Sequence, residues 1–137
     1  IFEKQYSALK LAIGGTGFFI TLLSLIVGGI GIMNIMFVSV KERTREIGVR
    51  KAIGATKGMI MSQFLMEAVT ICLIAGLIGL FFAYISSIFI NKIFPSTLPL
   101  GLSISAVILS MVVGVVSGMI PSYRAANLDP IDSLRYE

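Results

Sequence analysis

The sequence lacks the residue types on which most catalytic and metal sites depend. Its 137 residues include no histidine, no tryptophan and a single cysteine. Zinc and similar metals need several His or Cys ligands, so a site of that kind is excluded, as is an internal disulfide. The phosphate-binding pattern G-x-x-x-x-G-K-[ST] is absent too. We therefore expect no catalytic residue, metal or cofactor in this chain, and we interpret Cys72 as a small packing residue.

Charged residues are scarce and unevenly placed. They make up 13% of the chain, against 56% hydrophobic residues. Three stretches contain no Asp, Glu, Lys or Arg: Leu11–Val40, Ala68–Asn91 and Ile93–Tyr123. A helix of about 20 apolar residues crosses a hydrocarbon core of roughly 30 Å. The pattern predicts an all-α integral membrane protein with three transmembrane helices and excludes a water-soluble domain.

Turn-forming residues and charges set the expected boundaries. Pro95, Pro99 and Gly101 indicate a loop after the second apolar stretch, which shortens the third span. A helix over the whole first stretch would measure about 45 Å and should protrude from the bilayer. The predicted order is an N-terminal segment 1–10, a span 11–40, a connection 41–58, a span 59–91, a loop 92–102, a span 103–121 and a tail 122–137. Because the first residue is Ile, we expect this to be the C-terminal part of a longer polypeptide.

The basic residues predict the orientation in the membrane. Six of the eleven Lys and Arg residues lie between Lys41 and Lys57, whereas the loop 92–102 has only Lys92. By the positive-inside rule, the connection 41–58 and the C-terminal tail are cytoplasmic, and the N-terminus is outside. About half of these cations need do no more than anchor helices at anionic lipid. Nucleic-acid binding is not needed to explain the net charge of +4.

Small residues recur at helical spacing within the apolar stretches. In lipid, where apolar burial does not drive association, small residues four apart let helix backbones approach closely. An Asn side chain can hydrogen-bond across such an interface. In the first span the expected packing residues are Gly28, Gly31 and Asn34. In the second span the expected residue is Gly79, which forms a row with Ala75, Ala83 and Ser87. In the third span they are Gly114 and Gly118, which form a row with Ser110.

The connection 41–58 has the sequence of a short helix, a tight turn and a second helix start. We expect Thr44 to be an N-cap, Gly54 a C-cap and Thr56 the N-cap of the next helix. The segment is both basic and apolar, which suits either the lipid interface or a protein partner. We interpret Glu67 as the structural ion-pair partner of a basic residue here, in preference to a proton or ion site.

Two motifs carry a family resemblance. The stretch GGIGIMNIMFVSVKERTREIGVRKAIGATKGMIMSQFLMEA (Gly28–Ala68) resembles the permease domain of the MacB and FtsX-like family of ABC transporters. The ending PSYRAANLDPIDSLRYE (Pro121–Glu137) resembles the C-terminal signature of that family. The match at ERTREIGVRKAIGA is long and gapless, and the hydropathy between the motifs agrees as well.

The resemblance implies an architecture. Such permeases have four spans, with a large extracytoplasmic domain between the first two, so this chain would be a fragment holding spans two to four. Residues 1–10 would then end the stalk of that domain. The family works in the bacterial inner membrane as a permease dimer served by two ATP-binding domains, fused or separate, which hold the ATP and Mg.

The resemblance also assigns the connection 41–58 as the coupling helix that docks on the ATPase. The expected role of its residues is contact and force transfer without chemistry. The residues carried over are Glu42, Arg43, Thr44, Glu46, Ile47, Gly48, Arg50, Lys51, Gly54 and Ala55.

The implied mechanism is mechanotransmission, in which helices relay ATPase motion to the extracytoplasmic domain. The leading expectation is a MacB-type exporter of drugs, peptides or similar substrates, whose partners could include a periplasmic adaptor and an outer-membrane channel. The alternative is the same machinery used for lipoprotein release, as in the LolC and LolE branch, or for regulating cell-wall hydrolases, as in the FtsX branch. A third is a lipid-packed bundle without an ATPase.

If the region from Gly28 to Gly31 forms the moving seam of the permease dimer, replacing both Gly28 and Gly31 with Leu should abolish ATP-coupled transport. The added side chains would keep the two backbones apart. Transport at the wild-type rate in the double variant of the complete transporter would contradict this assignment.

Overall fold

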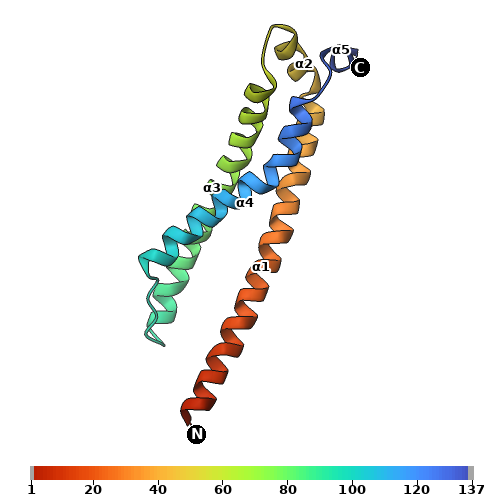
Figure 1. Cartoon of the computed structure of the whole chain (residues 1–137). Coiled ribbons are helices and arrows are strands. Elements are labelled where there is room, and N and C mark those ends of the chain that lie inside the picture. The colour runs from red at the N-terminus through yellow and green to blue at the C-terminus, as the bar shows by residue number, and fades with distance from the viewer. Residues whose placement is uncertain (1, 136–137) are drawn as a thin grey trace.

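The computed structural model describes residues 2–135, which form five helices and no strand. In chain order the helices are α1 (Phe2–Glu42), α2 (Thr44–Ala52), α3 (Lys57–Asn91), α4 (Leu100–Ala126) and α5 (Pro130–Arg135) (Figure 1). Helices α1, α3 and α4 are each long and apolar enough to cross a membrane. The predicted all-α fold with three membrane-spanning helices is confirmed.

Helix α1 is a single rod of 41 residues, about 60 Å long at 1.5 Å per residue. That length is about twice the hydrocarbon core of a bilayer. Its N-terminal half stands apart from α3 and α4, whereas its C-terminal half runs beside α4 (Figure 1). The described part of the segment 1–10 is therefore continuous in helical structure with the first span.

Helices α3 and α4 pack at close range through small residues. A Cβ added to Gly114 would lie 2.9 Å from the Val69 Cα, and one added to Gly118 would lie 2.6 Å from the Ala68 Cβ. Ser110 packs against Gly76, where a Cβ would lie 2.5 Å from the Ser110 Oγ. The structure thus places Gly114 and Gly118 at the helix contact for which they were proposed.

The α3 row that meets α4 differs from the predicted one. Gly79 has no other part of the chain within 4 Å of an added Cβ, and Ala75 and Ala83 are exposed. The contact row on α3 is Ala68, Cys72 and Gly76, which also repeats every fourth residue. Both rows have the spacing of one helix face, and only the position of α4 decides which of them is covered.

On α1, too, the residue that packs against α4 is next in sequence to a predicted one. Gly29 is buried against α4, where an added Cβ would lie 2.8 Å from the Ser117 Oγ. Gly28 and Gly31 have nothing within 4 Å of an added Cβ, and Asn34 is exposed. Within this chain, therefore, the close approach of α1 to α4 is at Gly29 and not at the predicted residues Gly28 and Gly31, because one residue along a helix turns the side chain by about 100°.

Helix α4 is longer than predicted at both ends. The expected loop 92–102 ends at Pro99, which occupies the N-cap position, and Gly101 lies in the first helical turn. The expected span 103–121 continues through Pro121 to Ala126, so residues 122–126 of the predicted tail belong to α4. Pro121 lies inside α4, where a proline removes one backbone hydrogen bond, and both Pro121 and Ser122 are fully buried.

We predict that Gly118→Ala destabilises the protein, whereas Gly79→Ala does not. The methyl group at position 118 would collide with the Ala68 Cβ on a packed backbone, at a cost of about 1–3 kcal/mol. At Gly79 the methyl group meets open space, and Ala favours a helix by up to about 1 kcal/mol. Thermal unfolding of the full-length protein in detergent measures both variants, and equal midpoints would contradict the packing described here.

Candidate functional site

The candidate site is the end of the molecule where α2 lies across the tips of the long helices. Helix α1 ends at Glu42, and α2 begins only two residues later, at Thr44. The Thr44 hydroxyl donates to the carbonyl oxygens of Val40 and Lys41, at 3.0 and 2.9 Å. The prediction of Thr44 as the N-cap is wrong: Arg43 holds that position without a side-chain cap, because Thr44 instead satisfies the last carbonyls of α1.

The far end of α2 is closed by a glycine turn, as predicted. Gly54 has a φ of 108°, a left-handed conformation that favours glycine. The Gly54 N–H donates to the Lys51 carbonyl at 3.1 Å, and the Ala55 N–H donates to the Arg50 carbonyl at 2.9 Å, which is the Schellman pattern. The Thr56 hydroxyl then accepts from the Met59 N–H at 3.3 Å, so its role as the N-cap of α3 is confirmed.

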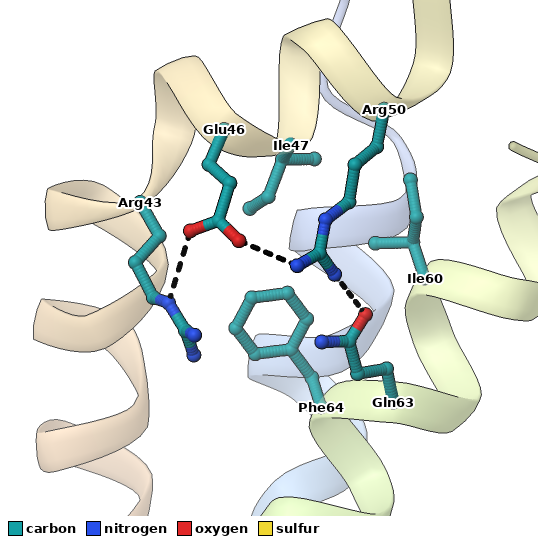
Figure 2. A pocket seen from close by; sticks show the side chains of 7 residues that line it. All are labelled: Arg43, Glu46, Ile47, Arg50, Ile60, Gln63 and Phe64. Carbon is teal, nitrogen blue, oxygen red and sulfur yellow. Dashed lines mark hydrogen bonds and ion pairs between the residues drawn. The ribbon is translucent and has the colours of Figure 1, made fainter. Parts of the chain in front are cut away.

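One face of α2 is anchored in the hydrophobic core. Ile47 is 3% exposed and belongs to a cluster to which α1, α3 and α4 also contribute. Figure 2 shows the Ile47 side chain pointing toward Phe64 and Ile60 of α3. The full cluster is Met36, Val40, Ile47, Ile60, Phe64, Ala68 and Ala125.

Polar side chains link α2 to α3 beside this core. Arg43 contacts Glu46 and Glu67, each at 3.4 Å, and Arg50 contacts both Glu46 and Gln63 (Figure 2). The predicted structural pairing of Glu67 is confirmed. Because the paired side chains are 38–47% exposed, each pair stabilises the fold by at most about 1 kcal/mol. Only the Arg43–Glu67 pair connects to α3 and so helps to fix the direction of α2.

The C-terminal segment holds α2 from another side. The Lys51 ammonium donates to the carbonyl oxygens of Ala126 and, at 2.6 Å, Leu128, so it caps the C-terminal end of α4. Burial lowers the pKa of Lys51, the nearby Lys57 lowers it further, and Asp129 raises it. The hydrogen bonds offset part of this desolvation cost.

Helix α5 packs directly on the backbone of α2. Gly48 is buried, and a Cβ there would lie 2.7 Å from the Ser133 Cβ. The Asp129 side chain accepts from the Ile131 N–H at 2.9 Å, and the buried Ser133 hydroxyl donates to the Asp129 carbonyl at 2.6 Å. Only glycine at position 48 permits this approach. Residues 136 and 137 of the predicted tail lie outside the described residues.

The ten residues assigned to ATPase contact therefore divide by exposure. Ile47 and Gly48 are buried within this chain, so the direct contact that the resemblance implied for them is corrected to a packing role. The half-buried members hold α2 in place or lie close to its ends: Arg43, Thr44, Arg50, Lys51 and Ala55. The exposed members are Glu42, Glu46 and Gly54.

Two exposed apolar residues were missing from that set. Val49 of α2 is 45% exposed, and Ile53, the C-cap of α2, lies about one turn further on and is 82% exposed. The sequence indicates this surface by spacing. Val49 and Ile53 are four residues apart and so share one side of the helix, whereas Val49 follows the buried Ile47 by two residues and so lies on another side. The surface formed by Val49 and Ile53 is called the α2 apolar edge below.

The sequence of this chain matches that of known proteins over most of its length. A family described as FtsX-like permease C-terminal matches residues 18–130. This chain belongs to that family. An uncharacterized ABC transporter permease YknZ of Bacillus subtilis is 51% identical over 84% of this chain and 30% of its own length. Macrolide export ATP-binding/permease proteins MacB of Rhodopirellula baltica and Burkholderia thailandensis are 46% and 49% identical over 96% of this chain, and over 18% and 20% of their own lengths.

The FtsX-like chain thus spans less than a third of the length of these relatives. The matched residues include α2, most of α1 and all of α3 and α4. The three apolar helices make it a multi-pass membrane protein.

We predict that Lys51→Met loosens the C-terminal segment of this FtsX-like permease. The change leaves two carbonyls without their charged donor, and hydrogen bonds to charged groups contribute about 1.5–3 kcal/mol. Lys57→Met is the comparison, because Lys57 makes one exposed bond, to the Asn127 side chain at 3.1 Å. Amide hydrogen exchange of residues 127–135 in the full-length protein measures the effect, and equal protection in the two variants would contradict it.

Proposed function

We propose that this chain provides spans two to four of a permease in an ATP-driven exporter, and that α2 receives the motion of an ATPase. The observation that carries the proposal is the position of the α2 apolar edge. Ile53 projects outward from a helix whose opposite face is buried in the core. Exposed apolar side chains on a rigidly held element suit contact with another protein.

The bracing of α2 supports force transfer. The core, the Arg43–Glu67 ion pair, the Arg50–Gln63 hydrogen bond and the Lys51 cap join α2 to all three long helices. A push on Ile53 would therefore displace the ends of α1, α3 and α4 together. Because α1 is one rod from Glu42 back to Phe2, it would carry that displacement through the membrane and beyond it.

The proposed orientation puts α2 and the C-terminus in the cytoplasm of a bacterial cell, with the chain in the inner membrane. Six of the eleven basic residues lie between Lys41 and Lys57, next to α2, which supports this orientation. In this proposal ATP and Mg bind to the ATPase partner, fused or separate, and two permease copies form the transporter. The names of the MacB relatives, macrolide export proteins, favour drugs or similar compounds as the exported substrates.

We predict that Ile53→Asp uncouples ATP turnover from transport. A charge at the centre of an apolar contact removes a binding hot spot of at least about 2 kcal/mol, which corresponds to more than a tenfold loss. The fold should persist, because Ile53 is 82% exposed. The measurement is substrate-stimulated ATP turnover by the complete transporter in proteoliposomes, after mass spectrometry has established which ATPase copurifies.

Ile53→Met is the matched control and should keep wild-type coupling, because it preserves the apolar surface. Wild-type coupling in Ile53→Asp, or the absence of any ATPase from the purified protein, would overturn the proposed function. Substitution of Ile47 is a poor test, because a polar side chain there would disrupt the core itself.

A further inference from the structure

An apolar groove of about 430 Å³ runs between α1 and α4 on the membrane surface of the molecule. The α1 side is formed by residues that include Ile26, Ile30 and Met33, and the α4 side includes Val116 and Ile120. The two helices run in the same direction here and separate toward the N-terminus of α1 (Figure 1). The lining is largely apolar, and four of its residues, Ile26, Val112, Val116 and Ile120, are 50–63% exposed, so the groove is open to lipid.

The α2 end of the groove is positively charged. One turn beyond Met33 and Ile120 lie Phe37 and Arg124, and the Arg124 guanidinium carbon is 5.0 Å from the centre of the Phe37 ring. This cation–π contact fixes the guanidinium while leaving its N–H edges open to an anion. Lys41 follows Phe37 by four residues, on the same face of α1.

These two cations have no acidic partner within residues 2–135. The basic side chains that form ion pairs there are Arg43 and Arg50, whose partners are Glu46 and Glu67. Arg124 and Lys41 are both exposed. An anion that approaches along the membrane surface therefore meets two uncompensated charges at the mouth of the groove.

We propose that this groove binds an anionic phospholipid, with an acyl chain between α1 and α4 and the phosphate at Arg124 and Lys41. The groove lining from Leu22 to Met33 spans about 17 Å of helix, close to one leaflet of a core of roughly 30 Å. An apolar channel that ends in cations matches the chemistry of such a lipid along its whole length. An apolar helix without an acidic residue at this end would leave Arg124 and Lys41 without a counter-charge.

The inference rests on the proposed orientation in one respect only, the assignment of the lipid to the cytoplasmic leaflet. Binding itself depends on the groove and its cations. The test therefore uses no ATP and no transport readout, and Ile53→Asp should bind lipid like the wild type even though it uncouples transport. Failure of one proposal is thus distinguishable from failure of the other.

The experiment is native mass spectrometry of the full-length protein, released from nanodiscs that contain equal amounts of phosphatidylglycerol and phosphatidylcholine. The wild-type protein should retain phosphatidylglycerol preferentially. Arg124→Gln and Lys41→Gln should each lower that preference about fivefold, the effect expected for one cation at a membrane surface. Val116→Trp should reduce retention with both charges intact, because the ring fills the groove.

Two matched variants test specificity. Lys92→Gln removes a cation that also lies over an aromatic ring, 5.9 Å from the centre of Phe89, but at the opposite end of the molecule, and it should leave the preference unchanged. Leu77→Trp adds the same ring at an exposed position of α3 and should not reduce retention.

Three results would overturn the proposal. The first is equal retention of both lipids by the wild type, and the second is an unchanged preference when Arg124 and Lys41 are both replaced by Gln. The third is efficient disulfide dimerisation of Val116→Cys in a background without other cysteines, which would show that a second copy of the chain fills the groove.

Discussion

The burial of Ile47 is the contact on which the rest of this end of the structure depends. Its side chain joins a short polar helix to a core supplied by α1, α3 and α4. Burial of Ile47 in the core fixes the rotation of α2 about its own axis. Gly48 therefore contacts α5, and the α2 apolar edge faces outward. The Arg43–Glu67 ion pair refines this geometry but is too exposed to create it.

Different interactions stabilise the α3–α4 contact in the membrane and the region around α2. In lipid, the burial of apolar side chains contributes little to the association of α3 with α4. The association depends on close backbone approach at Gly76, Gly114 and Gly118. Around α2, water is present, so apolar burial and capping of helix ends become effective again. The structure places its only short helices, α2 and α5, in this second region among the residues it describes. The α1 rod, whose N-terminal half stands apart from the other helices, therefore contrasts with the tightly packed α3–α4 pair (Figure 1).

Much of the fold was predictable because lipid imposes simple rules. The uncharged stretches predicted the three long helices, and the residue types at the helix ends predicted the roles of Gly54 and Thr56. The sequence could not decide between Gly28 and Gly29, or between Gly79 and Gly76, because spacing defines a row without saying which row meets a neighbour. The contact of the C-terminal tail with α2 could not be predicted either, because Lys51 and the Ala126 carbonyl are 75 residues apart and no local sequence pattern connects them.

The central claim is that α2 and the C-terminal segment move as one unit. It is tested most directly by electron paramagnetic resonance distance measurements between spin labels at Arg45→Cys and Asp132→Cys. Both sites are exposed, on α2 and α5 respectively. The complete transporter, without other cysteines, would be compared in its nucleotide-free and ATP-bound states. The account predicts the same narrow distance distribution in both states, and a shifted or broadened distribution with ATP would contradict it.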